Sequence, residues 1–202
     1  MDQEHLRQEK PLTSQESLDL IARMIGKAKS DYIDTGISAL LWGGIIGFCG
    51  LVTFANYYIG WEWLNFVWLL SIIAVIPQII ISARERKKRR HKRYEDDLMG
   101  GIWISFGCSM FLLSYFEGVY NIPHANSIFL VVYGIPTFAT GYGRRFKPMI
   151  IGGIACWVFA ILCAYAPAPY QMLYITAGAQ LAWFIPGLIL RKSYLKAKQQ
   201  NV

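Results

Sequence analysis

Residues 63–82 read WLNFVWLLSIIAVIPQIIIS, and residues 84–93, which follow almost at once, read RERKKRRHKR. The first stretch has the length of about 20 apolar residues that an α-helix needs to cross a bilayer core of about 30 Å. Its apolar residues do not alternate with polar ones, which disfavours a strand of a membrane β-barrel. A basic cluster directly after such a stretch is typical of the cytoplasmic end of a transmembrane helix. Together the two stretches indicate an α-helical membrane protein.

The composition of the whole chain agrees with this interpretation. Of the 202 residues, 54% are apolar and only 16% are charged, whereas soluble domains carry about 25% charged residues. The net charge of +7 would suit a nucleic-acid-binding tail, but such a tail is never this apolar. The composition therefore excludes a disordered or nucleic-acid-binding protein.

Six apolar stretches of membrane-spanning length are visible, and short connections join them. Because backbone groups must bond within their own segment in lipid, each stretch is expected to be a helix. The predicted fold is an all-α membrane protein with six transmembrane helices in three tandem hairpins, over residues 36–84, 98–145 and 149–192. The predicted helices are 36–57, 63–82, 98–115, 126–143, 149–166 and 170–190.

The basic residues predict the orientation. Five lie in the first 35 residues, eight between the second and third helices, three between the fourth and fifth helices, and four after residue 190. With six helices, all 20 lie on one side of the membrane, which the positive-inside rule makes the cytoplasm. The predicted organisation is a cytoplasmic or interfacial segment at 1–35, a transmembrane domain at 36–190 and a basic cytoplasmic tail at 191–202.

The basic cluster itself has two interpretations. A cluster at a membrane surface contacts anionic lipid headgroups, whereas the same composition elsewhere marks a nucleic-acid patch. The lipid interpretation is favoured because acidic residues 95–97 follow at once, so the expected partners are lipids and not nucleic acid. The candidate headgroup contacts are Arg86, Lys87, Lys88, Arg89 and Arg90.

Two short motifs recur once in each predicted hairpin. Gly-Gly-Ile lies in the first helix and Ile-Pro in the second, with 34, 36 and 34 residues from the first glycine to the proline. Glycines let helices approach closely in membranes, and proline kinks a helix. The repeat is therefore either a packing device or a set of three kinks around a cytoplasmic vestibule. The candidate hinge and packing residues are Gly43, Gly44, Gly100, Gly101, Gly152, Gly153, Pro77, Pro136 and Pro186.

The N-terminal segment contains an amphipathic pattern. Apolar residues recur at positions 18, 21, 25, 28 and 32, which is the spacing of one helix face. This helix can lie in the membrane interface, pack on the cytoplasmic end of the bundle, or pair with a second copy as a short coiled coil.

Residues 16–29 read ESLDLIARMIGKAK and lead into Leu41-Trp42-Gly43 at the start of the first span. This stretch of about 45 residues resembles the N-terminal part of a group of small bacterial multipass membrane proteins. The resemblance implies a bacterial cytoplasmic (inner) membrane, and it assigns no activity and no functional residue to this chain.

The ionisable residues give little support for catalysis. No Asp, Glu, Lys, Arg or His lies in the middle of a predicted span, and membrane enzymes usually hold such groups at depth. No Cys-x-x-Cys is present, so neither a metal nor a cofactor is expected. Two pairs offer an alternative: Glu117 and His124 flank one outer loop, where they could form a metal or proton site, and Asp31 and Asp34 lie one turn apart and could bind a cation.

A few polar residues within the spans could line a cavity for a neutral amphipathic ligand. The expected function is nevertheless non-enzymatic, as a regulatory, sensing or scaffold subunit with a homo-oligomeric or membrane-protein partner. The alternative is a channel or transporter for small solutes or ions, built on the three hairpins. The candidate cavity-lining residues are Gln78, Gln180, Thr137 and Trp183.

Overall fold

The computed structural model describes residues 13, 15, 35–88 and 94–200, and in these residues the chain is helical without a β-strand. The amphipathic pattern at 18–32 and most of the stretch that resembles bacterial membrane proteins lie outside the described residues, as do Arg89 and Arg90.

The described chain forms six helical rods. Three are single uninterrupted α-helices: α2 (Ile37–Ile59), α5 (Tyr94–Tyr120) and α7 (Lys147–Tyr165). A fourth, α6 (Ala125–Gly143), stays helical through Pro136. The fifth rod joins the 3₁₀-helix η1 (Glu62–Trp68) to α3 (Leu69–Ile73) and α4 (Val75–Lys88). The sixth joins α8 (Ala168–Ala179) to the π-helix η2 (Gln180–Phe184) and α9 (Ile185–Gln200).

Within the described residues, five rods are long and apolar enough to cross a membrane. The prediction of an all-helical, multi-pass membrane protein is confirmed at this level. The rod outside this set is α6, and its sequence shows the reason, because it carries threonine, tyrosine and glycine among its apolar residues. Tyr133, Thr137 and Thr140 are buried, so these polar side chains contact protein rather than lipid.

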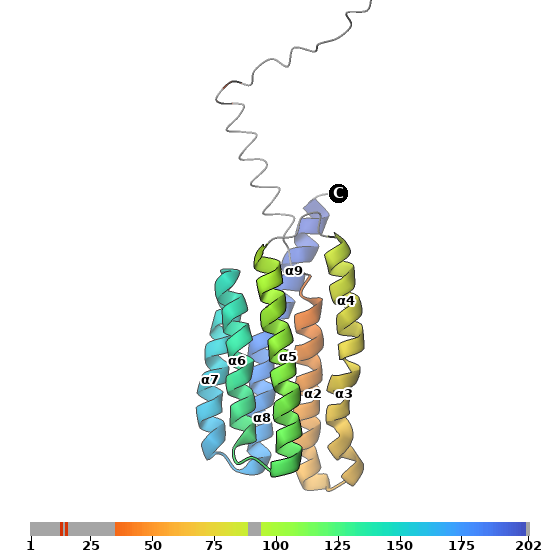
Figure 1. The fold of residues 1–202 in the computed structure, drawn as a ribbon, viewed down its shortest axis with the longest axis vertical. Coiled ribbons are helices and arrows are strands. Elements are labelled where there is room, and N and C mark those ends of the chain that lie inside the picture. The colour runs from red at the N-terminus through yellow and green to blue at the C-terminus, as the bar shows by residue number, and fades with distance from the viewer. Residues whose placement is uncertain (1–12, 14, 16–34, 89–93, 201–202) are drawn as a thin grey trace, which may run out of the picture.

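The rods stand side by side with their axes close to parallel (Figure 1). The α8–η2–α9 rod packs on three others, which are α2, α6 and α7. The longest contacts join α6 to α7 and α8–η2 to α2. The η1–α3–α4 rod packs on α2, and α5 packs on α6, but no extensive contact joins α4 to α5.

The breaks within two rods lie close to proline. A turn at Ala74 separates α3 from α4, three residues before Pro77. The π-helix η2 ends two residues before Pro186. Proline has no N–H to donate, so the helix before it loses a backbone hydrogen bond and can change its winding there.

Candidate functional site

The side chains expected to line a cavity form hydrogen bonds with neighbouring helices. Trp183 of η2 donates from Nε1 to Thr137 Oγ1 of α6 at 2.8 Å, and Thr137 donates in turn to the carbonyl oxygen of Tyr133 at 2.8 Å. Gln180 Nε2 donates to the carbonyl oxygen of Gly43 on α2 at 3.1 Å. The structure thus brings Thr137 and Trp183 together and places Gln180 three residues away on the same π-helix.

Gln78 lies apart from the other three, on α4. Its Oε1 accepts a hydrogen bond from Trp42 Nε1 at 3.1 Å. Its Nε2 donates to Ser38 Oγ at 3.1 Å and to Ser82 Oγ at 3.0 Å. Trp42 and Ser38 belong to α2, so Gln78 fastens α4 to α2.

An aromatic cluster fills the interior between α5, α6 and η2. It consists of Trp103, Phe106, Tyr133 and Trp183, whose neighbouring ring centroids lie 5.0–6.2 Å apart. Trp103 Nε1 donates to Thr140 Oγ1 of α6 at 3.1 Å. Two tryptophans from different helices therefore donate to threonines that lie one turn apart on α6.

Trp183 and its partner Thr137 were predicted from the sequence as candidate site residues, whereas Trp103, Phe106, Tyr133 and Thr140 were not. A signal for them was present, because Tyr133, Thr137 and Thr140 recur at helical spacing in an otherwise apolar helix. Such a polar stripe marks a face that contacts protein.

The glycines of the three Gly-Gly-Ile motifs have different environments. A Cβ on Gly43 would lie 2.6 Å from the backbone nitrogen of Phe184, and one on Gly152 would lie 2.7 Å from Cα of Ala182. A Cβ on Gly153 would lie 2.8 Å from Cβ of Phe138 on α6. Gly44 has a single side-chain atom of Phe184 at 4.0 Å. Gly100 and Gly101 of α5 have no atom within 4 Å of such a Cβ.

The prolines of the motif lie near these contacts. Phe138 follows Pro136 by two residues, and Phe184 precedes Pro186 by two residues. Pro136 and Pro186 are buried, whereas Pro77 is only partly covered. In two of the three proline-bearing rods, the backbone close to the proline therefore packs on a glycine of another helix. In α4, no glycine of another described helix packs close to Pro77.

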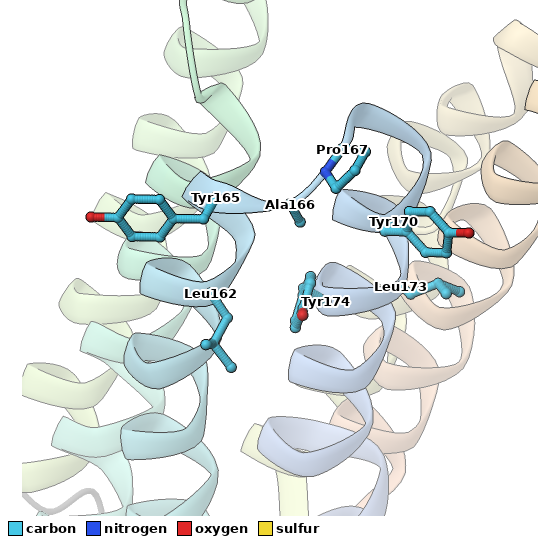
Figure 2. Close-up of a pocket in the computed structure, with 7 residues that line it drawn as sticks. All are labelled: Leu162, Tyr165, Ala166, Pro167, Tyr170, Leu173 and Tyr174. Carbon is cyan, nitrogen blue, oxygen red and sulfur yellow. The ribbon is translucent and has the colours of Figure 1, made fainter.

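Two open depressions lie on the surface of the described residues. One of about 390 Å³ lies where α7 turns into α8 and is lined by Tyr165, Tyr170 and Tyr174 with Leu162, Ala166, Pro167 and Leu173 (Figure 2). The other, of about 530 Å³, is lined by residues of α6 and α7 around Trp157. Neither includes Gln78, Gln180, Thr137 or Trp183.

The ionisable residues of the described part form no cluster of three or more that could hold a metal ion. Glu117 lies near the end of α5, and His124 immediately precedes α6 and is exposed. Arg86, Lys87 and Lys88 are the last three residues of α4, and Lys87 is exposed.

Comparison with protein families, with curated proteins and with solved structures finds no match to this chain. We therefore infer its function from the arrangement of its own residues.

Proposed function

We propose that this protein is a non-enzymatic subunit of the bacterial cytoplasmic membrane that acts through contacts with other membrane components, in a regulatory, sensing or scaffold role. The observation that carries the proposal is the uneven burial of its apolar helices. In three of the five apolar spans, 28–39% of an apolar stretch of 18 residues is buried, but only 6% of such a stretch is buried in the span 62–85 and none in the span 97–120.

The interior supports a scaffold more than an enzyme. The polar side chains at the centre bond to one another, as in the Trp183–Thr137 and Trp103–Thr140 pairs. Paired groups of this kind fasten helices together in lipid and are not available for proton transfer or ion binding. Residues that could take part in function therefore lie on the outside of the bundle, mostly on α5 and the η1–α3–α4 rod.

We further propose that all six rods span the membrane as three related hairpins. The end of the bundle that carries the basic residues, together with both chain termini, would then lie in the cytoplasm. The support for α6 as a span is its 19 residues, which give a helix of about 29 Å, together with its packing on both α5 and α7. The support for the hairpins is the spacing of the glycine and proline motifs.

Photo-crosslinking in native membranes tests the scaffold role. Leu112 of α5 and Ile161 of α7 are both exposed apolar residues, and each can be replaced singly by benzoylphenylalanine. We expect a discrete protein adduct from position 112 and none from position 161. Equal labelling at the two positions, or no protein adduct at 112, would contradict the proposal.

The alternative of a channel or carrier is tested by flux. In liposomes that contain the purified protein, we expect the permeability to monovalent ions and small neutral solutes to equal that of protein-free liposomes. A protein-dependent flux that a variant such as Thr137→Val alters would replace the scaffold role by transport.

A further inference from the structure

The segment η1 is an unusual helix for a membrane span. It keeps 3₁₀ winding over seven residues, Glu62–Trp68, whereas 3₁₀-helices seldom exceed three or four residues because their hydrogen bonds are poorly aligned. Burial does not hold it, since none of its residues is buried and Trp63 and Phe66 are 65% and 67% exposed. Specific contacts with a neighbouring helix must therefore stabilise this winding.

Those contacts are hydrogen bonds to α2. Asn56 Nδ2 donates to Asn65 Oδ1 at 2.9 Å, and Trp68 Nε1 donates to Thr53 Oγ1 at 3.0 Å. A 3₁₀-helix has three residues per turn, so side chains three positions apart lie directly above one another. This winding points both Asn65 and Trp68 at α2, whereas in an α-helix the two side chains would diverge by about 60°. The two bonds thus favour the 3₁₀ form.

The beginning of the η1–α3–α4 rod is also fixed to α2. The backbone N–H of Trp61 donates to Asn56 Oδ1 at 2.9 Å, and α2 ends at the C-cap Gly60, one residue earlier. Any change in the length of η1 therefore displaces the opposite part of the rod, α3 and α4, along α2.

The 3₁₀ and α forms of η1 differ in length. Seven residues span about 14 Å as a 3₁₀-helix and about 10.5 Å as an α-helix. The rod would thus be shorter by about 3.5 Å if η1 became α-helical. A span that is too long or too short for its bilayer carries an energetic cost for every ångström of mismatch. A thin bilayer should therefore favour the α form, and a thick bilayer the 3₁₀ form.

The rest of the rod has few contacts that oppose such a shift. Ala74 is the one buried residue between positions 62 and 85, so little apolar packing is lost when the rod moves along α2. A turn at Ala74 separates α3 from α4, and Pro77 cannot donate to the carbonyl oxygen of Ile73 four residues earlier. This weak point can absorb a change in winding. The hydrogen bonds of Gln78 to α2 are the polar contacts that the shift must break.

We propose that η1 is a length-adjusting segment, 3₁₀-helical in thick bilayers and α-helical in thin ones, through which this protein responds to the thickness of its membrane. The motion would carry the exposed residues Arg84 and Lys87 of α4 along the bilayer normal and so change the charge presented at the membrane surface. The inference names a stimulus for the sensing role but does not require that role, because the change occurs in the protein without a partner.

Pulsed electron paramagnetic resonance on the full chain measures the length of the rod. Nitroxide labels are placed on Glu62→Cys and Ile79→Cys, both exposed positions, with Cys108→Ser because the other three cysteines are buried. The protein is reconstituted in short-chain (dimyristoleoyl) and long-chain (dierucoyl) phosphatidylcholine. We expect the distance between the labels to be shorter by about 3.5 Å in the short-chain bilayer. Labels on Ile151→Cys and Tyr165→Cys, at exposed positions of the uninterrupted α7, should keep one distance.

A double variant tests the role of the two hydrogen bonds. In Asn65→Leu/Trp68→Phe, η1 loses both partners on α2, and we expect the short distance in both bilayers. Phe66→Leu, at an exposed position of the same helix, should keep the response of the wild type.

Three results would overturn the proposal. They are an equal distance in the two bilayers for the wild type, an equal shift in the α7 pair, and a double variant that keeps the wild-type response. If the double variant does not fold, the wild-type comparison decides by itself.

Discussion

The Gly-Gly-Ile motif occurs in three places with different packing. The same substitution, glycine to alanine, can therefore be compared between buried and open positions. In Gly43→Ala, the new Cβ would lie 2.6 Å from a backbone nitrogen of η2, so α2 and η2 must move apart. Overpacking of this kind costs about 1–3 kcal/mol. We expect Gly43→Ala to lower the free energy of unfolding in mixed detergent micelles by about 2 kcal/mol.

Gly100→Ala, at the first glycine of the second Gly-Gly-Ile motif, is the matched control for that variant. Its Cβ enters open space, and alanine is a better helix former than glycine by about 1 kcal/mol. The stability should therefore stay the same or rise. A similar loss in both variants would show that the two glycines have equivalent surroundings, contrary to the structure.

The Trp183–Thr137 hydrogen bond makes a second prediction at the residue scale. Thr137 is fully buried and Trp183 is 3% exposed, so in Thr137→Val the indole N–H loses its acceptor and water cannot replace it. We expect a loss of about 1 kcal/mol in the free energy of unfolding. A change of tryptophan fluorescence should accompany it. Ser105→Ala, which removes an exposed hydroxyl bonded only to its own helix, should have no measurable effect.

At the scale of single elements, α4 depends on one side chain for its polar contacts with α2. In Gln78→Leu, Trp42 and Ser38 both lose their partner on α4. We expect faster backbone hydrogen exchange over residues 75–88 and unchanged exchange over residues 147–165. Ile79→Leu, at an exposed position of the same helix, provides the control. Uniform exchange in both helices would mean that α4 is held by its apolar contacts instead.

The elements also show which features of a helix can be predicted from the sequence and which cannot. The apolar stretch at 63–82 correctly predicted a spanning rod, because a membrane core requires about 20 apolar residues whatever the neighbours are. It did not show that the rod begins as a 3₁₀-helix and breaks at Ala74. The π-helix at Gln180–Phe184 was equally invisible, because a π-helix depends on contacts with neighbouring helices as well as on the proline after it.

At the scale of the whole molecule, the positions of the 20 basic residues predict that one end of the bundle faces the cytoplasm. Glu62 begins η1 and Lys147 begins α7, at opposite ends of the bundle (Figure 1), and both are exposed. In intact bacteria, a membrane-impermeant maleimide should label Glu62→Cys and not Lys147→Cys, and disruption of the cells should make both reactive. The reverse order of labelling would invert the proposed orientation.

The sequence by itself determined that this is a membrane protein and that its chain is helical. Both follow from the length of its apolar stretches and from the need to bond every backbone group within lipid. It also placed glycines and prolines at matched positions, because spacing along the chain is a property of the sequence.

Only the tertiary structure decided what those residues contact. Gly43 and Gly100 are both followed by Gly-Ile in the sequence, yet η2 covers the first, and no atom lies within 4 Å of a Cβ on the second. Likewise, Gln78 and Thr137, which sequence alone offered as cavity residues, are bonded to other helices. The physical reason is that helix packing in lipid depends on the shape of each neighbouring surface, and that shape exists only once the helices are assembled.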